Sequence, residues 1–151
     1  HASPNHPKSR GSITLSTSNP YDYPKILFNY LEHEDDLKQT RESIHVARKI
    51  LSQPSLKQYS GKEVGPGNNS QSEEQLNEYI RLNAETAYHP CGTLKMGVDK
   101  MAVVDESLKI RGLQNIRVVD ASVMPEIPSA NLNAPTLMIA EKASDIIINR
   151  N

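Results

Sequence analysis

The chain has 151 residues, of which 36% are hydrophobic and ten are prolines, so it predicts a loop-rich protein with a modest core. Its 17 basic and 18 acidic residues are intermixed and give a net charge of -1, which excludes the basic stripe typical of nucleic-acid-binding proteins. The single cysteine excludes an internal disulfide and fits a reducing compartment.

Two short β-strands are predicted near the start of the chain. Residues 11–17 alternate Ile13 and Leu15 with Ser and Thr, the period-2 pattern of a half-buried strand. After the turn cluster "SNPYDYP", residues 25–31 again place apolar side chains on alternate faces. We expect both strands in one antiparallel sheet.

Two amphipathic helices are predicted next. From residue 34 to about residue 53, apolar residues recur at spacings near three, four and seven, and Pro54 ends the helix. Ser72 and Gln75 have the spacing of a capping box, which predicts a second helix from there to about residue 85.

The composition changes near residue 87, which predicts two segments, 1–87 and 88–151. In the second segment, turn residues separate three short apolar runs that we expect to be strands: 102–105, 108–110 and 116–120. A polar, proline-broken stretch follows. The chain closes with a strongly apolar helix, for which the spacing predicts a core stripe of Leu137, Ala140, Ala143 or Ser144, and Ile147.

The segment "YHPCGTLKMG", residues 88–97, is the first candidate for chemistry. With one cysteine and no His-x-x-x-His pair, the spacing argues against zinc, and we expect no metal site. Cys91 is too near His89 in an extended segment to face it, so a packed, inert thiol is favoured over a nucleophile. Pro90 and Gly92 would hold the His89 imidazole rigidly at the edge of a cleft, although a lone histidine is more often structural.

The second candidate is "SANLNAPT", residues 129–136, just before the last helix. Asn131 and Asn133 are either turn and N-cap residues or polar groups of a site. Pro135 in the first helical turn leaves free backbone donors at the helix start, where the macrodipole favours negative charge. Beside the predicted strand end at Asp120, such a loop lies where an α/β sheet places a cofactor.

Three stretches of the chain resemble the C-terminal part of the glucose-methanol-choline (GMC) oxidoreductase family, in particular its choline dehydrogenases and related alcohol dehydrogenases. These are "HPKSRGSITL", "YHPCGTLKMG" and "VVDESLKIRGLQNIRVVDASVMPEIPSANLNAPTLMIAEKASD". The resemblance covers nearly the whole chain. It implies an α+β fold in which 1–87 belong to an antiparallel-sheet substrate domain with two helices. Residues 88–151 would supply the closing strands and helix of a Rossmann-type FAD domain and carry the catalytic residues.

The resemblance further implies FAD-dependent oxidation of choline or a related primary alcohol to an aldehyde. His89 matches the family's active-site histidine, and Asn133 matches the position that the family fills with Asn or His as its partner. In such a site the histidine accepts the hydroxyl proton, the amide stabilises the alkoxide, and the α-hydrogen leaves as hydride to flavin N5. Because Asn133 does not titrate, we expect a simple loss of activity at low pH.

The cofactor contacts are also implied by the resemblance alone. Asp120 and Ala121 match a segment that approaches the ribityl and phosphate portion of the flavin. A second stretch matches the part that runs along the pyrimidine edge: Asn131, Asn133, Ala134, Pro135 and Thr136. Leu94 departs from the cysteine of many relatives, a change that we expect to alter packing only.

The dinucleotide fingerprint G-x-G-x-x-G is absent, since the nearest glycine pair, Gly65 and Gly67, follows no predicted strand. We therefore expect a C-terminal fragment that holds FAD poorly alone and needs the N-terminal FAD-binding region of the same enzyme. The alternative is a non-catalytic binding or interaction module that is inactive without such a partner. A purely structural domain would leave the His89 and Asn133 loops unexplained.

Other partners are excluded by composition. No apolar run approaches the roughly 20 residues of a membrane span, and the start of the chain has no hydrophobic signal core. We expect a soluble protein, cytoplasmic in preference to secreted, with neither a transmembrane segment nor a nucleic-acid partner.

Overall fold

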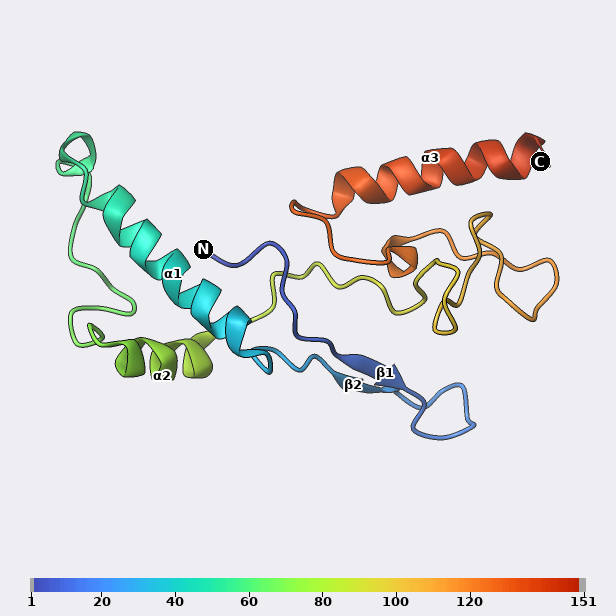
Figure 1. The fold of residues 1–151 in the computed structure, drawn as a ribbon, viewed down its shortest axis with the longest axis horizontal. Coiled ribbons are helices and arrows are strands. Elements are labelled where there is room, and N and C mark those ends of the chain that lie inside the picture. The colour runs from blue at the N-terminus through green and yellow to red at the C-terminus, as the bar shows by residue number, and fades with distance from the viewer. Residues whose placement is uncertain (1, 150–151) are drawn as a thin grey trace. The chain divides into compact units, whose positions relative to one another are not determined.

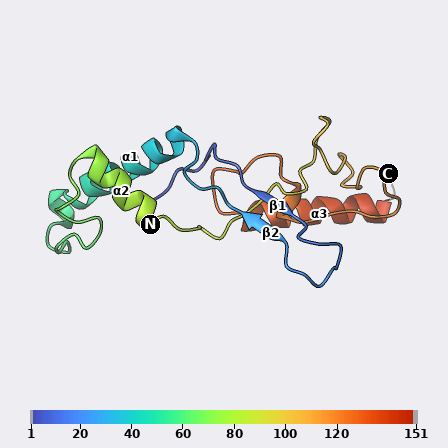
Figure 2. The same cartoon turned by 90° about the horizontal axis from the view of Figure 1, so that it is seen from below.

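The computed structural model describes residues 2–149, which contain two short β-strands, three α-helices and two 3-10 helices (Figures 1 and 2). The chain divides into two compact units, the first ending at Glu85 and the second beginning at Thr86. The division lies close to the change in composition near residue 87. Each unit has its own packing, and each is described separately.

The first unit contains the strands β1 (Ser12–Thr14) and β2 (Lys25–Leu27), which pair antiparallel with Ile13 opposite Ile26. The prediction of one antiparallel sheet is confirmed, but both strands are shorter than predicted. Beyond β2, Asn29 and Leu31 take left-handed φ values of 58° and 61°, which a strand cannot contain.

The strands are not half-buried, as their alternation predicts. Ile13 is 52% exposed and Ile26 is 54% exposed. Two strands alone offer few apolar neighbours, and a two-stranded sheet normally needs further strands or a helix against one face. The first unit therefore leaves an apolar sheet face in solvent.

The helices α1 (Glu34–Leu51) and α2 (Glu73–Asn83) contact each other in the first unit. The predicted capping box at the start of α2 is confirmed, since Ser72 and Gln75 each bond the backbone of the other. Pro54 was expected to end the first α-helix. A 3-10 helix, η1 (Pro54–Leu56), begins at this proline.

A buried carboxylate ties the segment before β1 to the start of α1. Asp36 is 2% exposed and accepts the backbone N–H groups of Lys8 and Ser9, each at 2.7 Å, and the Ser9 hydroxyl at 2.5 Å. Burial raises the pKa of the Asp36 carboxyl, but these hydrogen bonds outweigh it and hold the pKa below its ordinary value. The next residue, Asp35, pairs with the Lys8 ammonium at the surface.

Arg48 of α1 bonds the loop between α1 and α2 and holds it against α1. Its guanidinium bonds both carboxylate oxygens of Glu63 at 2.9 to 3.1 Å and the carbonyls of Gly67 and Ser70 at 3.3 and 3.0 Å. The hydrogen bond from Arg48 is the main cause that lowers the pKa of the Glu63 carboxyl. This loop is thus fixed by one side chain that neutralises a carboxylate and satisfies two carbonyls.

The second unit is built on one apolar core and contains η2 (Ala121–Val123) and α3 (Asn133–Asn149). Its buried members are Val104, Leu108, Val123, Met124, Leu132, Ile139 and Ala143. The prediction of regular strands in this unit is wrong for the described residues. Only isolated bridges form there: Met96 with Val104, Val104 with Ile110, and Lys109 with Arg117.

Backbone turns explain why these apolar runs do not become strands. Leu108, Gly112 and Asn115 all have positive φ values, of 62°, 79° and 61°. The chain therefore bends at the start of the second run, two residues after it, and directly before the third. The runs still supply core residues, such as Val104 and Leu108, which are almost completely buried.

The predicted core stripe of α3 is wrong in part. Ile139 and Ala143 are buried, whereas Leu137 is 62% exposed and Ile147 is 49% exposed. The sequence "TLMIAEKASDIII" carries apolar residues on most sides of the helix, so their spacing does not single out one face. In residues 2–149 no helix is long and apolar enough to cross a membrane.

Candidate active site

The loop that carries His89 runs beside the segment predicted to approach the cofactor. The N–H groups of every second loop residue donate to the three successive carbonyls of η2: Gly92 to Ala121 at 3.3 Å, Leu94 to Ser122 at 2.9 Å, and Met96 to Val123 at 2.8 Å. Segments separated by some 30 positions in the sequence are therefore held together by the backbone itself.

Gly92 is required where these two segments meet. Its φ is 82°, and a Cβ atom at this position would lie 3.1 Å from the Met124 carbonyl oxygen. Gly92→Ala should therefore lower the free energy of unfolding by about 1–2 kcal/mol, the usual penalty for a left-handed L-residue, plus the cost of the close contact. Urea denaturation measures this, with Gly61→Ala as the control because no atom lies within 4 Å there. Equal stability of the two variants would contradict the assignment.

His89 is half-buried, and its imidazole makes no hydrogen bond or ion pair with any group in residues 2–149. Pro90 follows it and restricts its backbone to extended conformations. Cys91 is partly buried and packs against the core of the unit. A partly buried imidazole with both ring nitrogens unused is able to bond a ligand.

The loop of Asn131 and Asn133 is anchored by the residue between them. Leu132 is buried in the core and stands at the N-cap of α3, and its carbonyl accepts the Thr136 N–H at 2.9 Å and the Thr136 hydroxyl at 2.6 Å. Pro135 lies in the first turn, as predicted. The side chains of Asn131 and Asn133 are exposed and bond no group within residues 2–149, so neither acts as the cap.

Asp120 has a structural function in the described chain. Its carboxylate accepts the Ser122 N–H at 2.7 Å and thereby starts η2. Ala121 packs against the core, and the Ser122 hydroxyl oxygen is buried without a hydrogen-bond partner in residues 2–149. The Ser122 hydroxyl is thus a hydrogen-bonding group of this segment that no group in the described chain satisfies.

All the predicted site residues lie in the second unit, and one core holds the three segments that carry them. Cys91, Ala121 and Leu132, one from each segment, contact this core. At the start of α3 the N–H groups of Asn133 and Ala134 have no intrahelical acceptor, which suits the carbonyl-rich edge of a flavin ring. These donors fit one edge of FAD; a glycine-rich cradle for its pyrophosphate is absent from the sequence.

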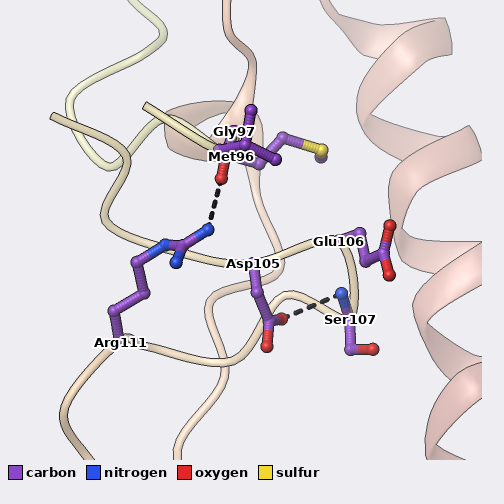
Figure 3. A pocket seen from close by; sticks show the side chains of 7 residues that line it. Met96, Gly97, Asp105, Glu106, Ser107 and Arg111 are labelled. Carbon is purple, nitrogen blue, oxygen red and sulfur yellow. Dashed lines mark hydrogen bonds between the residues drawn. The ribbon is translucent and has the colours of Figure 1, made fainter. Parts of the chain in front are cut away.

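A surface depression of about 310 Å³ lies apart from the predicted residues, and none of them lines it (Figure 3). Two of its polar side chains are already engaged: Arg111 donates to the Gly97 carbonyl at 2.6 Å, and Asp105 accepts the Ser107 N–H at 2.9 Å. The depression lies between bends of the chain and contains neither a histidine nor a cysteine. Over residues 2–149 no cluster of three or more His, Cys, Asp or Glu side chains is arranged to hold a metal ion.

Comparison with known sequences decides the family. A family profile described as GMC oxidoreductase, covering its C-terminal domain, matches residues 7–140. The chain belongs to the GMC oxidoreductase family. The fold described above is therefore that of a C-terminal GMC segment, with a small sheet and helices.

Individual GMC relatives agree with this. The chain is 52% identical over 139 residues to the oxygen-dependent choline dehydrogenase of Escherichia coli O45:K1 (strain S88 / ExPEC), which covers 92% of this chain and 25% of that protein. It thus spans about a quarter of the length of the curated relatives that it matches. No glycine fingerprint is present in this quarter.

Solved GMC structures share the fold of the chain. The pyridoxine 4-oxidase from Mesorbium loti superposes with a TM-score of 0.87 and 35% identity, over 93% of this chain and 27% of that one. An FAD-dependent oxidoreductase from Chaetomium thermophilum gives 0.90 and 28%, over 96% of this chain and 25% of that one.

The structure adds two residues to the His89 loop that the sequence alone does not single out. The Thr86 hydroxyl accepts the Tyr88 N–H at 3.0 Å, and Tyr88 has a φ of 59°. The threonine could have been recognised, because Ser and Thr hydroxyls commonly accept the N–H two residues on. The left-handed tyrosine could not, because bulky residues rarely adopt that conformation.

Proposed function

We propose that this chain is the C-terminal part of an FAD-dependent GMC alcohol dehydrogenase that oxidises choline or a related primary alcohol to the aldehyde. The observation that carries the proposal is the half-buried His89, which has no hydrogen-bond partner within residues 2–149 and is held on the same core as the Asn133 loop. The 52% identity to a choline dehydrogenase supports the choice of substrate class.

In this proposal His89 accepts the proton of the substrate hydroxyl. The amide group of Asn133 donates to the substrate oxygen as negative charge develops on it. Asn131 to Thr136 would lie along one edge of the flavin, where the start of α3 favours negative charge, and Asp120 and Ala121 would lie near its ribityl portion. FAD, when bound, supplies the acceptor for the two electrons that leave the α-carbon.

We also propose that the first unit belongs to the substrate domain and that the second completes the FAD domain. The partner is the N-terminal FAD-binding region of the same enzyme. Two facts support this: the chain spans about a quarter of its relatives, and each unit leaves apolar side chains in solvent. Examples are Ile13 of β1 and Leu137 of α3, which adjoining strands or helices would cover.

The pH dependence of turnover tests the role of His89. In the full-length enzyme, kcat should fall as the pH is lowered through the range in which histidine protonates, because an imidazolium cannot accept the substrate proton. Asn133 adds no titration. Asn133→His introduces a second imidazole and should add a second titration to the profile. A wild-type rate that stays flat through the histidine range would rule out His89 as the base.

A further inference from the structure

The residue before His89 holds an unusual backbone conformation. Tyr88 has a φ of 59°, a region that costs a residue with a side chain about 1–2 kcal/mol. Its ring is 77% exposed, so packing of the ring does not offset this cost. The conformation must therefore be held by the backbone bonds around it.

One side chain supplies such a bond. The Thr86 hydroxyl accepts the Tyr88 N–H at 3.0 Å and closes a short turn over Ala87. Thr86 is itself partly buried. Within residues 2–149 no other hydrogen bond is made by Ala87 or Tyr88.

The chain is fixed independently on the other side of His89. Pro90 restricts the His89 backbone, Cys91 packs on the core, and the Gly92 N–H donates to the Ala121 carbonyl at 3.3 Å. On the near side, the left-handed dihedral angles of Tyr88 set how the chain enters His89. These angles are held by Thr86.

We propose that Thr86 is a positioning residue for His89: by holding Tyr88 in the left-handed turn, its hydroxyl aims the imidazole. This inference rests on the proposed role of His89 as the base. Thr86 itself touches neither substrate nor cofactor in this account. A small displacement of the imidazole is enough to slow proton transfer, because the base must lie within hydrogen-bond reach of the substrate hydroxyl.

Two substitutions in the full-length flavoenzyme separate the hydroxyl from the bulk of the side chain. Thr86→Val keeps the shape and removes the acceptor; Thr86→Ser keeps the acceptor. We expect Thr86→Val to lower kcat by about 10- to 100-fold with KM and bound flavin nearly unchanged, and Thr86→Ser to stay within about threefold of wild type. Equal losses in both variants would overturn the proposal, and so would a Thr86→Val enzyme that matches the wild type both in kcat and in the accessibility of His89.

A second readout does not depend on turnover. Diethyl pyrocarbonate modifies accessible neutral imidazoles, and peptide mass spectrometry gives the rate at His89 relative to exposed His45 on α1. Thr86→Val should change the ratio by about threefold or more, and Thr86→Ser should not. An unchanged ratio in Thr86→Val overturns the positioning role. A changed ratio with unchanged kcat supports the positioning role and removes His89 as the base.

If Thr86→Val does not fold, Tyr88 offers a matched pair. Tyr88→Asn and Tyr88→Val both lose the ring, but asparagine tolerates the left-handed conformation and valine does not. The asparagine variant should retain at least about fivefold more kcat than the valine variant. Equal kcat values of the two variants would contradict the proposal that the left-handed turn at Tyr88 positions His89.

Discussion

His89→Ala in the full-length flavoenzyme should lower turnover of the alcohol by about two to four orders of magnitude, the usual loss when a general base is removed. The imidazole has no protein partner in residues 2–149, so its removal breaks no hydrogen bond that supports the fold. The loss should therefore appear in kcat, with the flavin still bound. Steady-state turnover and the absorbance of bound flavin measure the two quantities separately.

His45→Ala is the matched control, because His45 lies exposed on α1 and makes no hydrogen bond in the described chain. We expect it to stay within about twofold of wild type. If His89→Ala costs less than tenfold, His89 is not the base. If it releases the flavin, the imidazole supports the cofactor site instead.

Asp36→Ala should give the largest loss of stability, about 2–4 kcal/mol in the free energy of unfolding of the first unit. The substitution leaves three donors without their acceptor: the N–H groups of Lys8 and Ser9 and the Ser9 hydroxyl. It also frees the segment before β1 from the start of α1. Thermal or urea unfolding followed by helix circular dichroism measures the change.

The neighbouring carboxylate provides the control. Asp35→Ala removes an exposed pair with Lys8, and such solvent-screened surface pairs contribute little to stability. If both variants lose the same stability, burial of Asp36 is not what matters.

The pH dependence of Asp36 has a definite sign. Its folded pKa lies below the ordinary value, so the carboxylate stabilises the fold above the unfolded pKa of about 4. This contribution is lost as the pH falls through the folded pKa. Wild-type stability should therefore decline below about pH 4 more steeply than that of Asp36→Asn, which cannot titrate. Parallel curves for the two proteins would contradict this.

The helices of the first unit were predictable because their limits are set locally. The capping box of Ser72 and Gln75 and the proline at 54 act within one helical turn, and α1 and α2 end within about two residues of the predicted limits. The strands were predictable only as a pair. Their lengths depend on neighbours and on left-handed turns at Asn29 and Leu31, which no periodicity indicates.

The second unit shows where apolar patterns fail. Val104 and Leu108 look like strand residues and are buried, yet Leu108 has a φ of 62° and the chain turns there. Along α3, Leu137 and Ile139 are equally apolar, and only the packed structure distinguishes the exposed residue from the buried one.

The candidate site could be found by residue type but not by geometry. His89 and Asn133 lie in polar, proline-containing stretches whose composition differs from that of the apolar segments that build the core. This difference singled them out as candidates. Their shared attachment to one core, through Cys91 and Leu132, depends on tertiary packing. The left-handed conformation of Tyr88, next to the Thr86 hydroxyl, emerges only from the structure.

The central claim is that this chain supplies the base of an FAD-dependent alcohol oxidation. The most direct test is the visible absorption spectrum of the full-length protein, recorded without oxygen before and after addition of choline and of a simple alcohol. Flavin bands should bleach in the wild type, and they should persist in His89→Ala over the same interval. Absence of flavin bands from the full-length protein would contradict the claim and leave the non-catalytic module as the better account. Bleaching at the same rate without His89 would contradict it in another way, because a different group would then act as the base.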